Sequence, residues 1–335
     1  MAPQSRTQRM VGRSAFVPYF SKLKTTTYSD IAPSTRTANP LHSIKTLAWS
    51  PLGNFIATGA GDKTLRIWNP EKNQVKNSTE LKGHEGGIER VAWNPIKEAE
   101  LASVSSDGVV KFWDVRSRGV VWEQKFEGGG LTLAWKPDGQ ELVLGTKNAS
   151  QNDILIPISR KTQSVLGTYK QDVQTNQTIF SWSGTELFAT TGEGQVKIFD
   201  YPTMEQIHVL NAHTSACLAL DMSPTGDYLA VTGSDALISL WDTADWVCPR
   251  TFSDMMEPAR SVSFSFDGSY IVGNSTEGTT IDVGHVESGD VIHTVETGTS
   301  GGHGCVAWAP RNYMLAYAGE NPQALMIVGG LGGAA

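Results

Sequence analysis

Short apolar segments alternate with turns along most of the chain, and they recur at a nearly constant spacing. Each unit begins with an apolar segment that ends in an aromatic residue or methionine before a turn, as in LAWSP (47–51), VAWNP (91–95) and LAWKP (133–137). A second apolar segment, rich in β-branched and aromatic residues, follows each turn. Seven such units follow one another in steps of 42 to 45 residues. No segment sustains the i, i+3, i+4, i+7 spacing of an amphipathic helix, so the pattern predicts an all-β chain of short strands.

Acidic and aromatic residues recur in register with this pattern. Three units carry an aspartate six residues before a tryptophan, and two contain an upstream histidine, in Gly83-His84 and Ala212-His213. Repeats of this length with Gly-His and Trp-Asp marks are typical of WD40 proteins, and the chain resembles that family over residues 41–328. The resemblance implies a seven-bladed β-propeller with four strands in each blade. In blades three, six and seven the Trp-Asp position has no aromatic–acid pair, so spacing alone predicts those blades.

The recurring histidine, aspartate and tryptophan could serve a catalytic or a structural purpose. A hydrolytic triad also pairs histidine with aspartate, but it needs a nucleophile and occurs once in a chain. A repeated set favours the structural purpose, because a carboxylate can accept hydrogen bonds from turn N–H groups and an imidazole, and a buried indole N–H needs an acceptor. The resemblance implies a hydrogen-bonded tetrad that includes His84, Asp107 and Trp113 in blade two, His213, Asp235 and Trp241 in blade five, and Asp62 and Trp68 in blade one.

The seventh unit has sequence for only three strands, because the chain after residue 328 reads GGLGGAA. In WD40 proteins an N-terminal segment supplies the missing strand and covers the exposed edges. We therefore expect a strand within residues 23–40 to close the ring. The predicted domains are a basic N-terminal arm (1–24), the propeller (25–328) and a flexible glycine-rich tail (329–335). The arm contains AFVPYF (15–20), and so many aromatic residues predict docking on a blade edge or a partner.

Composition further restricts the classes of function that the chain could have. The net charge of −7 excludes a basic nucleic-acid platform, so any RNA contact is expected to be weak and to involve the basic arm. The sequence shows neither a membrane-spanning run nor a secretory signal. Its three cysteines, Cys217, Cys248 and Cys305, form no Cys-x-x-Cys pair, which predicts neither a disulfide framework nor a zinc site. No nucleophile, phosphate-loop or metal motif is recognisable, so we expect no enzymatic activity and no cofactor.

A more specific resemblance is centred on blade five. The stretches GSDALISLWDTADWVCPRTFS (233–253), RSVSFSFDGSYIV (260–272) and GHEGGIERVAWNP (83–95) are similar to the family of WD40 subunits of the THO complex. This resemblance implies a non-catalytic scaffold in the nucleus, a subunit of the THO/TREX assembly in co-transcriptional mRNP assembly and mRNA export. The implied partners are large helical THO subunits and, indirectly, an RNA helicase and export adaptors.

Two loops are candidate partner-binding segments. SDMMEPAR (253–260) places two methionines beside charged residues, which can form an adaptable apolar contact, and KNASQNDI (147–154) is long for its turn. Each could instead be an ordinary solvent loop. The candidate contact residues are Met255, Met256, Glu257, Arg260, Asn148 and Asn152.

A different class of partner is indicated by Trp113-Asp114-Val115-Arg116. This stretch matches the W-D-x-R box with which substrate receptors of some cullin–RING ubiquitin ligases dock their adaptor. Arg116 would lie just past a strand and could pair with an acidic adaptor surface. The alternative function is therefore a ligase substrate receptor.

Overall fold

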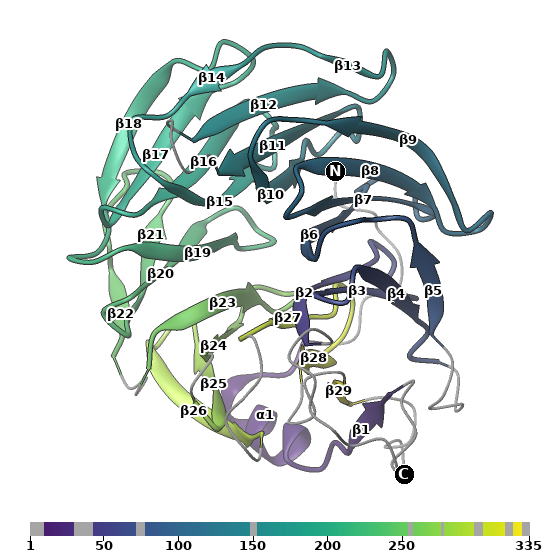
Figure 1. Cartoon of the computed structure of the whole chain (residues 1–335). Helices are drawn as coiled ribbons and strands as arrows, with labels where there is room; N and C mark the ends of the chain where they lie inside the picture. Colours follow the sequence, from purple (N-terminus) through teal and green to yellow (C-terminus); the bar gives the residue numbers. More distant parts are fainter. Residues whose placement is uncertain are drawn as a thin grey trace.

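Residues 10–29, 43–71, 78–147, 153–253, 257–275, 278–297, 304–318 and 324–329 are described by a computed structural model. Within these ranges the chain forms seven antiparallel sheets arranged in a ring (Figure 1). Each sheet is one blade, and in blades one to six the strands follow one another outward from the centre. The seven-bladed propeller implied by the resemblance to WD40 proteins is confirmed.

The blades are numbered in chain order from the first complete unit. Blade one contains β2 (Ile44–Trp49), β3 (Ile56–Ala60), β4 (Thr64–Trp68) and β5 (Thr79–Lys82), and blade two contains β6 (Ile88–Trp93), β7 (Glu100–Ser105), β8 (Val109–Asp114) and β9 (Gly119–Lys125). Blade three contains β10 (Gly129–Trp135), β11 (Glu141–Lys147), β12 (Ile154–Ser159), β13 (Ser164–Val165) and β14 (Tyr169–Lys170), and blade four contains β15 (Thr175–Phe180), β16 (Glu186–Thr191), β17 (Gln195–Asp200) and β18 (Gln206–Asn211). Blade five contains β19 (Cys217–Met222), β20 (Tyr228–Gly233), β21 (Ile238–Asp242) and β22 (Arg250–Phe252), and blade six contains β23 (Ala259–Phe264), β24 (Tyr270–Ser275), β25 (Thr280–His285) and β26 (Asp290–Glu296). Blade seven contains β27 (Val306–Trp308), β28 (Leu315–Ala318), β29 (Leu325–Val328) and, from the N-terminal region, β1 (Thr25–Tyr28).

The ring is closed by β1, which pairs antiparallel with β29 so that Thr25 lies opposite Val328 and Tyr28 opposite Leu325. This pairing makes β1 the outermost strand of blade seven. The expected closing strand therefore exists and lies inside the predicted interval 23–40.

A short helix precedes the closing strand. Helix α1 (Arg13–Phe20) buries Phe16 and Phe20, which are 0% and 1% exposed. Phe16 stacks on Tyr270 of blade six with 3.8 Å between ring centroids, and Phe20 meets Trp308 of blade seven edge-on at 5.5 Å. The aromatic segment of the N-terminal arm thus docks on blades six and seven, one of the two destinations expected for it.

Neighbouring blades pack through apolar side chains with little space between them. Leu65 and Ile67 of blade one, for example, belong to one buried cluster with Ile88 and Val91 of blade two. Gly59 lies at this interface, and a Cβ atom there would come within 2.4 Å of Ile88 Cγ2. The close approach of the two sheets therefore requires glycine at this position.

A β-bulge recurs near the start of the inner strands. Pairing with the second strand skips one residue in five blades, at Lys45, Glu89, Leu131, Leu218 and Arg260. A bulge re-aims side chains relative to a regular strand. Three of these residues, Lys45, Glu89 and Arg260, line a cavity at one end of the propeller axis.

Candidate functional site

In blade five the structure joins all three predicted residues in one hydrogen-bonded chain. His213 Nδ1 lies 2.9 Å from Asp235 Oδ1, and His213 Nε2 lies 3.0 Å from Ser239 Oγ. The indole of Trp241 donates to the same Ser239 oxygen at 2.9 Å. With its proton on Nδ1, His213 donates to the carboxylate and accepts from the Ser239 hydroxyl, and its Nε2 also lies 3.2 Å from the backbone carbonyl oxygen of Val231.

In blade two the same residue types are joined differently. His84 Nε2 lies 2.7 Å from Ser103 Oγ, and the Trp113 indole donates to that oxygen at 2.8 Å. His84 Nδ1, however, has no hydrogen-bond partner among the described residues. Asp107 instead accepts from the Ser105 hydroxyl and from the backbone N–H of Val109. The histidine–carboxylate bond implied by the resemblance is therefore present in blade five and absent from the described part of blade two.

Burial and hydrogen bonding set the charge states in blade two. Burial, followed by the positive charge of Lys111, lowers the pKa of His84 to about 4. Burial alone would raise the pKa of Asp107, but hydrogen bonds from Ser105 and Val109 outweigh it and lower that pKa. At neutral pH the pair is thus a neutral imidazole near a carboxylate, which suits a structural link and supplies no acid at pH 7.

Blade one contains the aspartate and the tryptophan without the histidine. The Trp68 indole donates to Thr58 Oγ1 at 2.8 Å, while Asp62 accepts from the backbone N–H of Thr64 and pairs with Arg66. In all three blades the aspartate accepts the backbone N–H two residues later, on Thr64, Val109 and Leu237. This bond fixes the turn between the second and third strands.

The hydroxyl group that accepts from the tryptophan indole in each of these blades was not predicted from the sequence. Thr58 and Ser103 each lie ten residues before their tryptophan, so the spacing contained a usable signal. In blade five the equivalent position is Val231, and Ser239 supplies the hydroxyl from the neighbouring strand. A search at fixed spacing would have failed there.

The candidate partner-binding residues fall into two groups. Met255, Met256, Asn148 and Asn152 lie outside the described residues. Glu257 is half-buried and Arg260 is exposed in the bulge of β23. Arg260 therefore lines the cavity at one end of the propeller axis and also ends the candidate loop 253–260.

Arg116 lies in the turn after β8 and its side chain is exposed. Its backbone N–H donates to Asp114 Oδ1 at 2.8 Å, which fixes the turn. With Phe55, Glu98 and Arg118 it lines a groove of about 280 Å³ between blades one and two.

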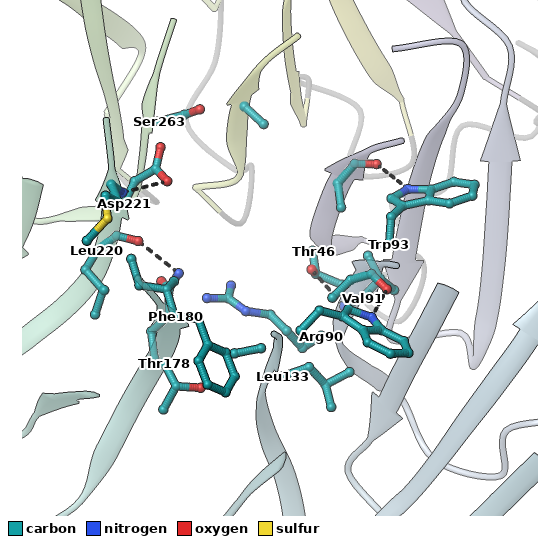
Figure 2. A pocket seen from close by; sticks show the side chains of 18 of the residues that line it. Thr46, Arg90, Val91, Trp93, Leu133, Thr178, Phe180, Leu220, Asp221 and Ser263 are labelled. Carbon is teal, nitrogen blue, oxygen red and sulfur yellow. Dashed lines mark hydrogen bonds between the residues drawn. The ribbon is translucent and has the colours of Figure 1, made fainter. Parts of the chain in front are cut away.

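The inner strands of all seven blades surround a central channel (Figure 2). One cavity of this channel has a volume of about 410 Å³ and is lined largely by apolar side chains, including Leu47, Leu133 and Val262. The Trp93 and Trp135 indoles donate to the carbonyls of Ala48 and Ala92 on preceding blades at 3.0 and 3.1 Å. These bonds hold neighbouring inner strands together and fix the channel wall.

Two ionisable side chains interrupt this apolar lining. Arg90 extends from β6 into the open centre, and Asp221 lies on the wall formed by blade five (Figure 2). The Asp221 carboxylate accepts the backbone N–H groups of Phe264 at 2.8 Å and Met222 at 3.0 Å. Burial raises the pKa of Asp221 to about 7 against the opposing effect of these two bonds. Asp221 is thereby tied to the backbone, whereas Arg90 has no hydrogen-bonding or ionic partner among the described residues.

A second cavity of about 520 Å³ lies at the bulge end of the channel. Its lining includes Lys45, Glu89, Arg90 and Arg260. Lys45 and Glu89 form an ion pair at 2.6 Å. The remaining charge at this mouth is therefore carried by two arginines.

Within the described ranges, no group of three or more histidine, cysteine or acidic side chains could hold a metal ion. Among the helices described there, none has the length and hydropathy needed to cross a membrane.

Comparison with known proteins identifies the repeats. The family model "WD domain, G-beta repeat" matches residues 35–69, 75–114 and 204–242, which cover most of blades one, two and five. THO complex subunit 3 of Arabidopsis thaliana is 32% identical over 280 residues, covering 83% of this chain and 87% of that protein. WD repeat-containing protein AAC3 of Dictyostelium discoideum is 33% identical over 82% of this chain and 61% of its own length.

A solved structure supports the architecture. The β-propeller domain of Cps50 (Swd1) from Myceliophteria thermophila superposes with a TM-score of 0.74 at 20% identity, covering 88% of this chain and 98% of that one. At this identity the match shows the fold alone.

Proposed function

This chain belongs to the WD40-repeat family that includes THO complex subunit 3, and from that premise we propose that it is a non-catalytic interaction scaffold within the THO complex. The observation that carries the proposal is the 32% identity extending over 87% of the Arabidopsis thaliana subunit. The match spans nearly the whole propeller and extends beyond a single repeat. The finer proposal is that the chain acts in the nucleus, within the THO/TREX assembly, in mRNP assembly and mRNA export.

Physical features of the propeller support a docking role. Ring closure pairs β1 with β29 and so leaves no open break between the first and last blades. The recurring aspartate fixes the turn between the second and third strands in blades one, two and five, and loops placed on such a rigid frame are suited to binding. The proposed partners are the large helical THO subunits directly, and an RNA helicase and export adaptors indirectly.

Affinity purification of the tagged full chain from nuclear extract, with mass spectrometry, tests this proposal. We expect large helical THO subunits and an RNA helicase to co-purify, and to remain after nuclease treatment because protein contacts hold them. Recovery of no THO subunit would contradict the scaffold proposal.

The loop carrying Met255 and Met256 is the proposed contact to test within that assembly. Changing both methionines to serine should reduce recovery of THO subunits, because the loop would lose its adaptable apolar side chains. A second variant changes Asn148 and Asn152 to serine and tests the other candidate loop in the same way. Unchanged recovery with both variants would exclude the two loops as main contacts.

One observation favours a second candidate function. Arg116 of the W-D-x-R stretch is exposed beside a groove between blades one and two, where an acidic adaptor surface could reach it. If the chain is instead a substrate receptor of a cullin–RING ligase, the purification would recover ligase adaptor and cullin. Arg116→Ala would then abolish that recovery, whereas in a THO subunit the same change should leave recovery of the other THO subunits unchanged.

A further inference from the structure

The bulge end of the central channel holds a cation without a counter-ion. Arg90 lines both the largely apolar cavity of the channel and the cavity at this mouth, and its guanidinium has no hydrogen-bonding or ionic partner among the described residues. The side chain points into the open centre of the ring (Figure 2). A guanidinium presents five N–H donors in a planar fork, and leaving it without an acceptor in a partly desolvated site carries a free-energy cost.

The charges around Arg90 decide which ligand fits. Lys45, Arg90 and Arg260 are the cations of the mouth and Glu89 is its anion. Glu89 is already neutralised by Lys45 at 2.6 Å, and Arg260, like Arg90, has no ionic partner among the described residues. Two guanidinium groups are therefore available at one mouth. An arginine stays charged at every physiological pH, so this property does not depend on a titration.

We propose that the mouth formed by Arg90 and Arg260 is a receptor site for a carboxylate side chain, supplied by an acidic segment of a partner protein. A carboxylate matches the guanidinium fork with two parallel hydrogen bonds. The apolar stem of a glutamate or aspartate would contact Leu47 and Val306, which line the same mouth.

A nucleic-acid phosphate fits the site less well. A polyphosphate chain would bring several negative charges toward Asp221 on the channel wall. The bulk charge of the molecule, −7, also opposes attraction of a long polyanion. A single carboxylate satisfies the arginines without that repulsion.

The inference deepens the proposed scaffold function by naming the chemistry of a docking contact, and it rests on that function for its partner. Its test measures peptide binding to the isolated full chain. The peptide can therefore fail to bind while THO subunits still co-purify, and it can bind when they do not. The two failures are therefore distinguishable.

The probe is a six-residue peptide with one central glutamate, and its control contains glutamine instead. Arginine Nε–Hε signals of the ¹⁵N-labelled protein are followed by NMR, and the Arg90 signal is assigned by its loss in Arg90→Lys. We expect the glutamate peptide to shift the Arg90 signal saturably, and the glutamine peptide to leave it unchanged. Arg90→Gln should weaken binding of the glutamate peptide roughly tenfold or more.

Matched controls separate the channel from general surface charge. Arg260→Gln should weaken binding of the probe, whereas Arg118→Gln, in the groove between blades one and two, should leave it unchanged. Equal binding by wild type and Arg90→Gln would overturn the proposal. So would a single-stranded RNA of eight uridines, or inorganic phosphate, that binds through Arg90 more tightly than the peptide does.

Stability provides a second readout. If Arg90 is unpaired in the free protein and gains its partner only from a ligand, Arg90→Met removes an uncompensated cation. The melting temperature of the free protein should then stay unchanged or rise. A fall of about 4 °C or more, corresponding to lost structural interactions, would show that Arg90 supports the fold, and it would overturn the proposal even if a peptide binds elsewhere.

Discussion

Single hydroxyl groups are the points at which the recurring histidine and tryptophan side chains meet. Ser103 and Ser239 each contact an imidazole nitrogen and an indole N–H. The aspartate acts beside them, on the turn: Asp235 accepts from His213 and from the backbone of Leu237. Removing the carboxylate therefore affects two bonds, and removing the hydroxyl affects a different two.

The first prediction concerns Asp235. Asp235→Ala should lower the free energy of unfolding by about 2 kcal/mol, because His213 and the turn both lose a charged acceptor. Urea denaturation at pH 7.5 measures the change. Asp227→Ala is the control, since Asp227 is exposed and its change should cost less than about 0.5 kcal/mol. Equal stability of the Asp235 variant and wild type would show that the carboxylate has no structural role.

The second prediction is a pH dependence from His84. Its folded-state pKa is about 4 and its ordinary value is 6.5, so between these pH values the unfolded chain binds more protons than the folded chain. The contribution of His84 to the free energy of unfolding is therefore fully present above pH 6.5. As the pH falls toward 4, this contribution decreases by roughly 3 kcal/mol.

The measurement must isolate His84, because Asp221 acts in the opposite direction. The folded-state pKa of Asp221 is about 7, above its ordinary 3.8, so protonation of Asp221 stabilises the folded state as the pH falls. The free energy of unfolding is measured for wild type and His84→Gln at pH 7 and at pH 4. The contribution of Asp221 is the same in both proteins and cancels in their difference. The stability advantage of wild type over the variant should shrink by roughly 3 kcal/mol across this range, and a constant difference would contradict the prediction.

At the scale of elements, helix α1 connects the N-terminal arm to two blades. Val11 donates to the Tyr313 hydroxyl and accepts from that of Tyr270, so backbone bonds flank the buried rings of Phe16 and Phe20. The docked aromatic rings fill a space between blades six and seven. The helix therefore contributes to the same core as the strands.

The third prediction follows from that packing. Phe16→Ala should reduce the free energy of unfolding by about 3 to 5 kcal/mol, because a fully buried aromatic ring leaves a cavity. Ser14→Ala, an exposed position of the same helix, is the control and should have little effect. Chemical denaturation followed by tryptophan fluorescence measures both. A small loss for Phe16→Ala would mean that α1 contributes little to the stability of the propeller.

The fourth prediction concerns closure. Deleting residues 1–28 removes both α1 and β1, and should yield protein that unfolds or aggregates because β29 becomes an exposed edge. Deleting residues 1–9 leaves every described contact of α1 and β1 in place and is the control. Size-exclusion chromatography with circular dichroism compares the two. A monomeric, folded 1–28 deletion would exclude closure by β1 as a requirement for folding.

Most of these elements could be predicted from the sequence, because strands of a propeller repeat their turns and apolar faces. The missing strand of blade seven could be placed within 23–40 because the resemblance to WD40 proteins implies an N-terminal closing strand, which covers edges that would otherwise be exposed. Helix α1 was not predicted, since its eight residues are too few for a periodic pattern and include Pro18. The exposure of Arg90 to the channel was also missed, because the bulge at Glu89 shifts which side chains face the axis, and no local pattern reports that shift.

At the scale of the whole molecule, two arginines without ionic partners among the described residues lie at the mouth of the channel, while the chain as a whole is acidic. The net charge of −7 implies weak long-range attraction for phosphate backbones. The channel arginines are too few to reverse this.

The fifth prediction is therefore weak RNA binding. A 20-nucleotide single-stranded RNA should bind the isolated chain with a Kd weaker than about 100 µM at physiological salt, outside the usual range of proteins that bind nucleic acid nonspecifically. Fluorescence anisotropy measures this affinity. The 1–9 deletion, which lacks Arg6 and Arg9, reports any contribution of the basic arm. Submicromolar binding by the full chain would contradict the prediction.

The pairing of β1 with β29 also sets an order of events in the cell. Thr25 is synthesised 303 residues before its partner Val328, so at about 5 to 20 residues per second a ribosome needs roughly 15 to 60 seconds to supply the last strand. During that interval blade seven is incomplete, and the unpaired strand edges can pair with other nascent chains. Closure therefore waits until Val328 has been made, and any partner that recognises the closed ring can distinguish a chain with seven complete blades from one whose last blade is still being made.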